Sequence, residues 1–164
     1  MPLRQEALHA SYRRLERPLF NVLYRQLWQA QDCQDVIHDA FVRVWERRDQ
    51  VDELTLDALV WTTALNLAKN RLRWRLLRRH DEVDANLPVS ADTEPHDFLA
   101  VRRLPQALRQ LPRAWQQVLL LAEFSGLSGG EMAAVLGIPA GTVASRKHLA
   151  IQRLKHLMEA SRNE

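Results

Sequence analysis

Polar and basic side chains gather near the C-terminus, in a stretch whose apolar residues recur at helical spacing. Five of them would lie on the outward side of this helix: Thr142, Ser145, Arg146, Lys147 and His148. Hydroxyl, guanidinium, ammonium and imidazole groups bind phosphate oxygens and the edges of bases, so the chemistry on offer is recognition of nucleic acid. An ordinary helical hairpin with a solvated basic face would give a similar pattern, and this alternative stays open here.

The elements that would hold these side chains form a helix-turn-helix. Ser128 and Glu131 have the spacing of a capping box, so we expect a helix to begin after Ser128. Gly137 would end that helix in a tight turn, and Pro139 suits the start of the next one because its missing N–H costs little there. The second helix of such a pair can enter the major groove of DNA.

A second basic stretch ends the helix that we expect from Thr55 to about Arg79. Its last part reads KNRLRWRLLRR, from Lys69 onward, and holds six basic residues and no acidic one. Trp74 lies among them, so the segment combines attraction for phosphates with an aromatic surface on which bases can stack. A basic helix end that only complements the helix dipole is the alternative, but that effect acts over a single turn.

The remaining segments also indicate helices, and we see no strand. Residues 3–30 have helical spacing, and we expect Pro18 to kink or divide them. Asp32 is the predicted N-cap of a helix that runs to about Arg48. Helices are also expected at 98–111, with Pro105 shifting the start, and at 113–125 after Pro112.

The distribution of charge predicts two domains. Residues 1–79 hold 14 basic and 10 acidic side chains, residues 80–99 hold none and 6, and residues 100–164 hold 9 and 4, which together give the net charge of +3. Two basic blocks point to a polyanionic partner. We therefore predict an all-α fold of two small helical domains, 1–79 and 98–164, joined by a flexible acidic linker at 80–97.

Several classes of protein are disfavoured. The chain has no P-loop, no G-x-G-x-x-G, no G-x-S-x-G and no zinc-ligand spacing, so we predict no enzyme activity, catalytic residue, cofactor or metal. Asp35, His38 and Asp39 fit a solvated helix face better than a metal site. No secretion signal or bilayer-spanning run is found, so we expect no membrane insertion. Cys33 stands alone, which fits a buried thiol in a reducing cytoplasm.

Three segments carry a resemblance to a known family. They are LPRAWQQVLLLAEFSGLSGGEMAAVLGIPAGTVASRKHLAIQRLKHL in the C-terminal half, and DCQDVIHDAFVRVWE and ALVWTTALNLAKNRLR in the N-terminal half. They resemble bacterial RNA polymerase sigma factors, most of all the extracytoplasmic-function (ECF) group. The resemblance covers nearly the whole chain except the predicted linker.

The resemblance implies partners and site residues. The helix after Asp32 would dock on the clamp of the largest polymerase subunit, through Asp35, Asp39, Arg43 and Trp45. The minus-ten promoter element would be read as it melts, by Asn66, Lys69, Asn70, Arg71 and Arg73. The loop 49–57 would accept a flipped base. The minus-thirty-five element would be read by the set Thr142, Ser145, Arg146, Lys147 and His148.

These assignments lead to one main hypothesis and one alternative. The first is an alternative-type sigma factor that binds core RNA polymerase and promoter DNA, directs transcription initiation, and is held by an anti-sigma protein. The second is a conventional helix-turn-helix regulator that binds duplex operator DNA as a dimer and is not a polymerase subunit. The second would lead one to expect a ligand-binding first domain, and residues 1–79 offer no such signature.

Overall fold

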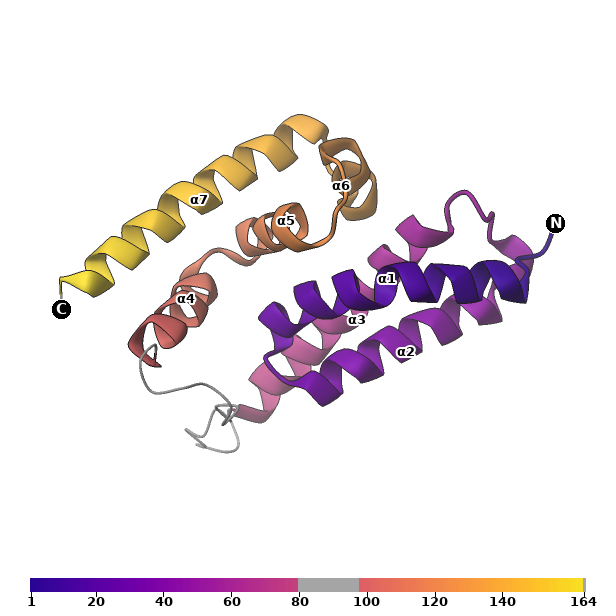
Figure 1. The fold of residues 1–164 in the computed structure, drawn as a ribbon, viewed down its shortest axis with the longest axis horizontal. Coiled ribbons are helices and arrows are strands. Elements are labelled where there is room, and N and C mark those ends of the chain that lie inside the picture. Colours follow the sequence, from indigo (N-terminus) through magenta and orange to yellow (C-terminus); the bar gives the residue numbers. More distant parts are fainter. Residues whose placement is uncertain (80–97, 164) are drawn as a thin grey trace.

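The computed structural model describes residues 1–79 and 98–163, and these ranges are helical with no strand (Figure 1). The predicted linker, 80–97, lies outside the described residues. The elements are α1 (Gln5–Leu27), α2 (Ala30–Glu46), a 3-10 turn (Arg48–Gln50), α3 (Leu56–Arg79), α4 (Phe98–Gln110), α5 (Arg113–Phe124), α6 (Gly129–Leu136) and α7 (Ala140–Arg162). No helix in the described ranges is long and apolar enough to cross a bilayer.

The N-terminal half is a bundle of α1, α2 and α3. Each helix carries apolar residues three or four positions apart, and these stripes face one another. Leu19, Leu23, Val60 and Trp61 are fully buried at the centre, and the Tyr12 ring meets the Phe41 ring edge to face at 5.1 Å. This packing fixes which faces of α2 and α3 remain outside.

Two predictions about this half fail, the first of them in part. Of the kink or division expected at Pro18, the division does not occur, because α1 runs through this residue without a break. A proline inside a helix costs about 3 kcal/mol, whereas burying Leu15, Leu19 and Val22 around it stabilises the unbroken form by roughly 1.5–3 kcal/mol each. Asp32 is not the N-cap of α2 either. That position is Gln29, and Asp32 lies in the first turn, where its carboxylate binds two arginines.

The C-terminal half consists of α4 to α7. The capping box predicted before α6 is confirmed: the Glu131 amide donates to Ser128 Oγ at 3.1 Å, and the Ser128 amide donates to Glu131 Oε1 at 3.1 Å. Gly137 then takes a left-handed conformation with φ 66°, and Pro139 caps α7. Pro105 lies inside α4 and does not shift its start, contrary to expectation.

The two halves share a hydrophobic core. Apolar residues of α5 and α6, among them Leu120, Met132 and Val135, belong to the same buried cluster as the core of the N-terminal bundle. Figure 1 shows α5 and α6 beside α1 and α3. The Thr62 hydroxyl of α3 lies 3.1 Å from the Val135 carbonyl oxygen of α6. The charge pattern of the sequence did not predict this association.

Aromatic rings and arginines complete the contact between the halves. The Arg25 guanidinium of α1 lies over the Phe124 ring of α5, 3.8 Å from its centroid. At the end of α1, Trp28 adopts φ 57°, which turns the chain toward α2. Its ring packs on the second cluster, formed by α4, α5 and α7, and Arg109 lies over it at 5.3 Å. The C-terminal end of α1 therefore contacts the C-terminal half of the molecule as well as its own bundle.

Candidate nucleic-acid and polymerase interfaces

The first candidate surface is the start of α7. Val143 and Ala150 are buried against the rest of the C-terminal half, so the opposite side of the helix faces outward. Ser145 and His148 are exposed on that side, Lys147 is exposed one turn after Val143 at the edge of the buried side, and Thr142 and Arg146 are half-buried. The structure thus brings all five predicted residues to the first turns of one helix. The capping box and Gly137 fix the angle at which that helix leaves α6.

The electrostatics of this surface favour an anion. From Ala140 to Met158 the helix has no acidic residue. Within the described residues, Arg146, Lys147 and His148 form no ion pair. Glu131 is the last acidic residue before α7, and its carboxylate is already hydrogen-bonded to Ser128. These hydrogen bonds hold the pKa of the Glu131 carboxyl below its usual range. The cations are therefore available to phosphates.

The second candidate surface is the C-terminal half of α3. Asn66, Lys69, Asn70 and Arg73 are exposed, and none of them forms an ion pair or side-chain hydrogen bond with another described residue. Amides can read base edges and cations can hold phosphates, so this face offers both kinds of contact.

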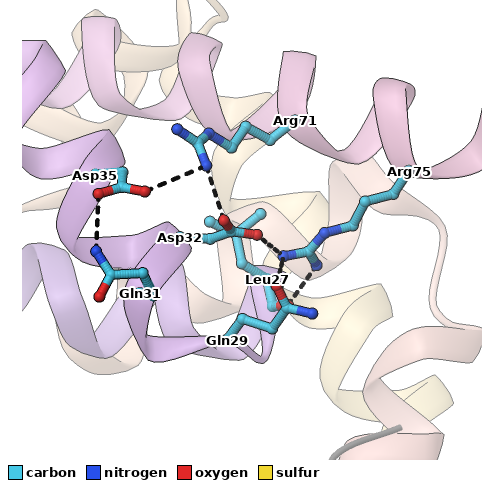
Figure 2. A network of polar contacts seen from close by, with 7 residues as sticks. All are labelled: Leu27, Gln29, Gln31, Asp32, Asp35, Arg71 and Arg75. Carbon is cyan, nitrogen blue, oxygen red and sulfur yellow. Dashed lines mark hydrogen bonds and ion pairs between the residues drawn. The ribbon is translucent and has the colours of Figure 1, made fainter. Parts of the chain in front are cut away.

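Arg71 differs from the other four predicted minus-ten residues. Figure 2 shows its guanidinium turned toward α2, where it lies 2.8 Å from the Asp32 carboxylate and 3.7 Å from that of Asp35. One turn later Arg75 also binds Asp32, and it donates to the carbonyl of Leu27. These contacts tie the basic end of α3 to the start of α2.

Sequence reasoning missed the roles of Asp32 and Arg75 in this network. The signal was present in the spacing, because Arg71 and Arg75 are four residues apart and Asp32 and Asp35 three apart. Each pair therefore lies on one helix face. The partnership between the two helices could not be read from either alone. The network joins Asp35, predicted to contact polymerase, to Arg71, predicted to contact DNA.

The third candidate surface lies on α2. Asp39 and Arg43 are exposed, Asp35 is half-buried beside Arg71, and Trp45 is half-buried beneath the Arg48 guanidinium at 4.9 Å. A hollow of about 730 Å³ opens between α1 and α2 beside Asp35. Its lining combines aromatic, aliphatic and polar side chains, among them Tyr12, Phe20, Asp35, Ile37 and His38. Such a mixture suits a protein partner.

The loop before α3 is held at both ends. The Arg4 guanidinium donates two hydrogen bonds to the Glu53 carboxylate, 2.9 and 3.2 Å long, and these contacts lower the pKa of Glu53. Asp57 accepts hydrogen bonds from Ser11 at 2.6 Å and Arg14 at 3.1 Å. Leu54 projects from the tip with 93% of its surface exposed. An apolar side chain presented on a fixed loop was not predicted, and its only signal is its place within a polar run.

Comparisons with known proteins agree on one family. The family described as Sigma-70 region 2 matches residues 11–78, and Sigma-70, region 4 matches residues 102–154. The RNA polymerase sigma-E factor of Streptomyces avermitilis is 34% identical over 134 residues, which cover 79% of this chain and 72% of the relative. The ECF RNA polymerase sigma factor SigE of Mycolicibacterium smegmatis is 27% identical over 153 residues, which cover 89% of this chain and 59% of that relative. The chain belongs to the ECF group of RNA polymerase sigma factors.

Two solved structures share the fold of this sigma factor. CnrH in complex with the cytosolic domain of CnrY superimposes with a TM-score of 0.74 at 25% identity, over 96% of this chain and 90% of that one. The sigma factor RpoE in complex with the anti-sigma factor NepR from Bartonella quintana superimposes with a TM-score of 0.64 at 22% identity, over 94% of this chain and 92% of that one.

The candidate surfaces all fall inside the matched ranges of the sigma factor. The region 2 match contains α2, the loop and the basic end of α3, while the region 4 match contains α5, α6 and the first turns of α7. Sigma factors are DNA-binding transcription initiation factors. The two cationic helix faces therefore lie in the parts of the chain that define the family.

Proposed function

We propose that this sigma factor binds core RNA polymerase through α2 and directs it to promoters with two separate DNA-reading surfaces. The observation that carries the proposal is the pair of outward, acid-free helix faces, one on α3 and one on α7, each on its own half of the molecule. Two such surfaces suit a protein that contacts two elements of one promoter.

The α3 surface would read the minus-ten element. Asn66 and Asn70 are one turn apart on an exposed face, so their amides can bond to neighbouring base edges, and Lys69 and Arg73 flank them to hold phosphates. The loop before α3, with Leu54 at its tip, would receive a base flipped out of the duplex. Unstacking costs a few kcal/mol, and contacts with a loop that two ion pairs already fix can offset this cost with little further ordering.

The α7 surface would read the minus-thirty-five element in the major groove. Thr142 and Ser145 lie in its first turns, where a recognition helix contacts base edges. Arg146, Lys147 and His148 would add contacts to phosphates and bases. This site is duplex DNA, in contrast to the melted minus-ten element.

Two protein partners would meet the α2 side of the molecule. Core RNA polymerase would contact Asp35, Asp39, Arg43 and Trp45. An anti-sigma protein would compete for overlapping surfaces, and the fold shared with a sigma factor bound to its anti-sigma factor supports this expectation. Because its partner enzyme works on the chromosome, we place the protein in the cytoplasm.

Run-off transcription tests the proposal. Core polymerase with this protein should give discrete transcripts from some fragments of the genome that core alone does not give. A conventional operator-binding regulator, the alternative considered from the sequence, would bind duplex DNA without polymerase and give no such transcripts. The match of residues 11–78 to region 2 gives that alternative no support.

A further inference from the structure

The C-terminal end of α3 presents a large aromatic side chain to solvent. Trp74 is 65% exposed, although tryptophan is usually well covered in folded proteins. The other tryptophans of the described residues are buried or half-buried and pack into the two clusters, as Trp61 does with 0% of its surface exposed. Trp74 is thus not needed for the core, and with the exposed Leu77 it forms an apolar patch that an external partner can cover.

The position of Trp74 on the helix identifies the surface to which it belongs. Asn66, Asn70 and Trp74 are spaced by four residues, and Leu77, 63% exposed, follows three residues later, so these side chains form one ridge along α3. Arg71 and Arg75 lie on another face, where Asp32 holds them. The ridge therefore continues the proposed minus-ten surface by one further turn.

The charges around the ridge select the class of occupant. Lys69, Arg73 and Arg78 flank Trp74, all are exposed, and none has an ion-pair partner among the described residues. After Asp57, α3 has no acidic residue. Arg113 of α5 adds another cation nearby, and its pKa is lowered by burial and then by the charge of Arg73. An apolar ring among unpaired cations suits nucleic acid better than a neutral protein groove.

We propose that Trp74 is a stacking platform for a base at the edge of the melted minus-ten element. One helical turn advances about 5.4 Å, and stacked bases are about 3.4 Å apart. Trp74 therefore reaches one or two base steps beyond the base that Asn70 contacts. Stacking on an aromatic side chain requires a base face freed from its neighbour, as at the boundary of a melted segment. This inference rests on the proposed function.

The test compares three substitutions of Trp74 in holoenzyme reconstituted from core polymerase and the full chain. The probes are a promoter fragment that the wild-type holoenzyme selects from fragmented genomic DNA, and the same fragment with a mismatched, pre-melted minus-ten element. Trp74→Ala should weaken binding to the pre-melted probe on the order of tenfold. Trp74→Phe should keep most of the affinity, because it keeps an aromatic face. Trp74→Leu should behave like Trp74→Ala.

Two controls make the result specific. Leu76→Ala removes an apolar side chain that is 58% exposed on a different face of α3, and it should leave binding unchanged. Trp74→Ala should also leave the dependence of affinity on salt unchanged, whereas Arg73→Ala should reduce the slope by about one. A 2-aminopurine placed at the first or second base beyond the Asn70 contact should be quenched by wild type and by Trp74→Phe only.

Three outcomes would overturn the inference. Equal affinity of Trp74→Ala and wild type would remove Trp74 from the interface. Full rescue by Trp74→Leu would indicate apolar docking of a protein surface, and loss of copurification with core would indicate a polymerase contact. A wild-type holoenzyme that gives no promoter-dependent transcript would instead contradict the proposed function, before any variant is made.

Discussion

At the scale of single residues, two arginines only two positions apart in the sequence have different surroundings. Arg71 is held by Asp32 and Asp35, while Arg73 is exposed beside the ridge of α3. The sequence predicted a phosphate contact for both, because charge and spacing say nothing about which guanidinium already has a partner. The contribution of Arg71 to stability can be separated from a contribution to DNA binding.

Alanine substitutions make that separation. Arg71→Ala should lower the free energy of unfolding by up to about 1 kcal/mol, because its ion pairs are about one-third exposed and screened by solvent. Arg73→Ala should leave unfolding unchanged and reduce the salt slope of promoter binding by about one. Chemical denaturation and salt titration of the holoenzyme measure the two effects. An Arg71→Ala protein with unchanged stability would contradict the role assigned to the network.

Cys33 provides a prediction about pH. Burial raises the pKa of its thiol to about 12, and the charge of Asp32 adds to this shift. In the unfolded chain the thiol titrates near 8.5, so above that pH the unfolded state holds fewer protons and stability falls. The loss should be about 1.4 kcal/mol per pH unit from roughly pH 9 to 11.

The Cys33→Ala variant isolates this contribution from other groups that titrate in the same range. The difference in unfolding free energy between wild type and Cys33→Ala should change with pH above about 9 and stay constant from pH 6 to 8. Urea denaturation at each pH gives the values. A difference that is flat up to pH 11 would show that the folded thiol ionises normally.

At the scale of elements, most boundaries could be predicted because they depend on local chemistry. The capping box at Ser128 and Glu131 and the turn at Gly137 bound α6 as expected. Errors arose where distant packing decides. The core around Pro18 keeps α1 continuous, and the arginines of α3 draw Asp32 into an ion pair instead of a cap. A local sequence pattern cannot reveal a partner that comes from another helix.

The α2 element carries the predicted polymerase contact, and a charge reversal tests it. Asp39 is exposed and forms no ion pair with another described residue, so Asp39→Arg should leave the fold intact. If Asp39 faces a cationic partner, the substitution should reduce copurification with core polymerase by tenfold or more, since like charges across an interface repel. Glu123→Arg, a charge reversal at an exposed residue of α5 away from the α2 surface, is the matched control. Equal loss in both variants would argue against a specific contact at Asp39.

At the scale of the whole molecule, the shared core sets a limit on function. Promoter elements centred at minus ten and minus thirty-five are about 85 Å apart along B-DNA at about 3.4 Å per base pair. The helices α3 and α7 each measure roughly 35 Å, and α3 packs directly on α6. The two halves must therefore separate before both surfaces can engage one promoter. The association was not predictable, because the apolar stripes of α5 and α6 do not show in the sequence which half of the chain will cover them.

A pair of distance labels on the two halves would detect the separation. In the free protein the labels should report one short distance, which should lengthen by tens of ångströms when core polymerase and promoter DNA are added. Thr62→Glu places a carboxylate at the C-terminal end of α6, which is unfavourable, so it should lengthen the distance without polymerase. Thr62→Ser keeps the hydroxyl and should not. A short distance retained in the promoter complex would contradict the separation.

The central claim is that α3 and α7 contact two separate elements of one promoter while the protein is bound to polymerase. Site-specific photo-crosslinking tests it most directly, with the crosslinker at Asn70 on α3 or at Ser145 on α7 and holoenzyme on a selected promoter. We predict crosslinks near minus ten from Asn70 and near minus thirty-five from Ser145, about 25 base pairs apart and both dependent on core polymerase. Crosslinks from both positions to the same few base pairs, or undiminished crosslinks without core, would contradict the account.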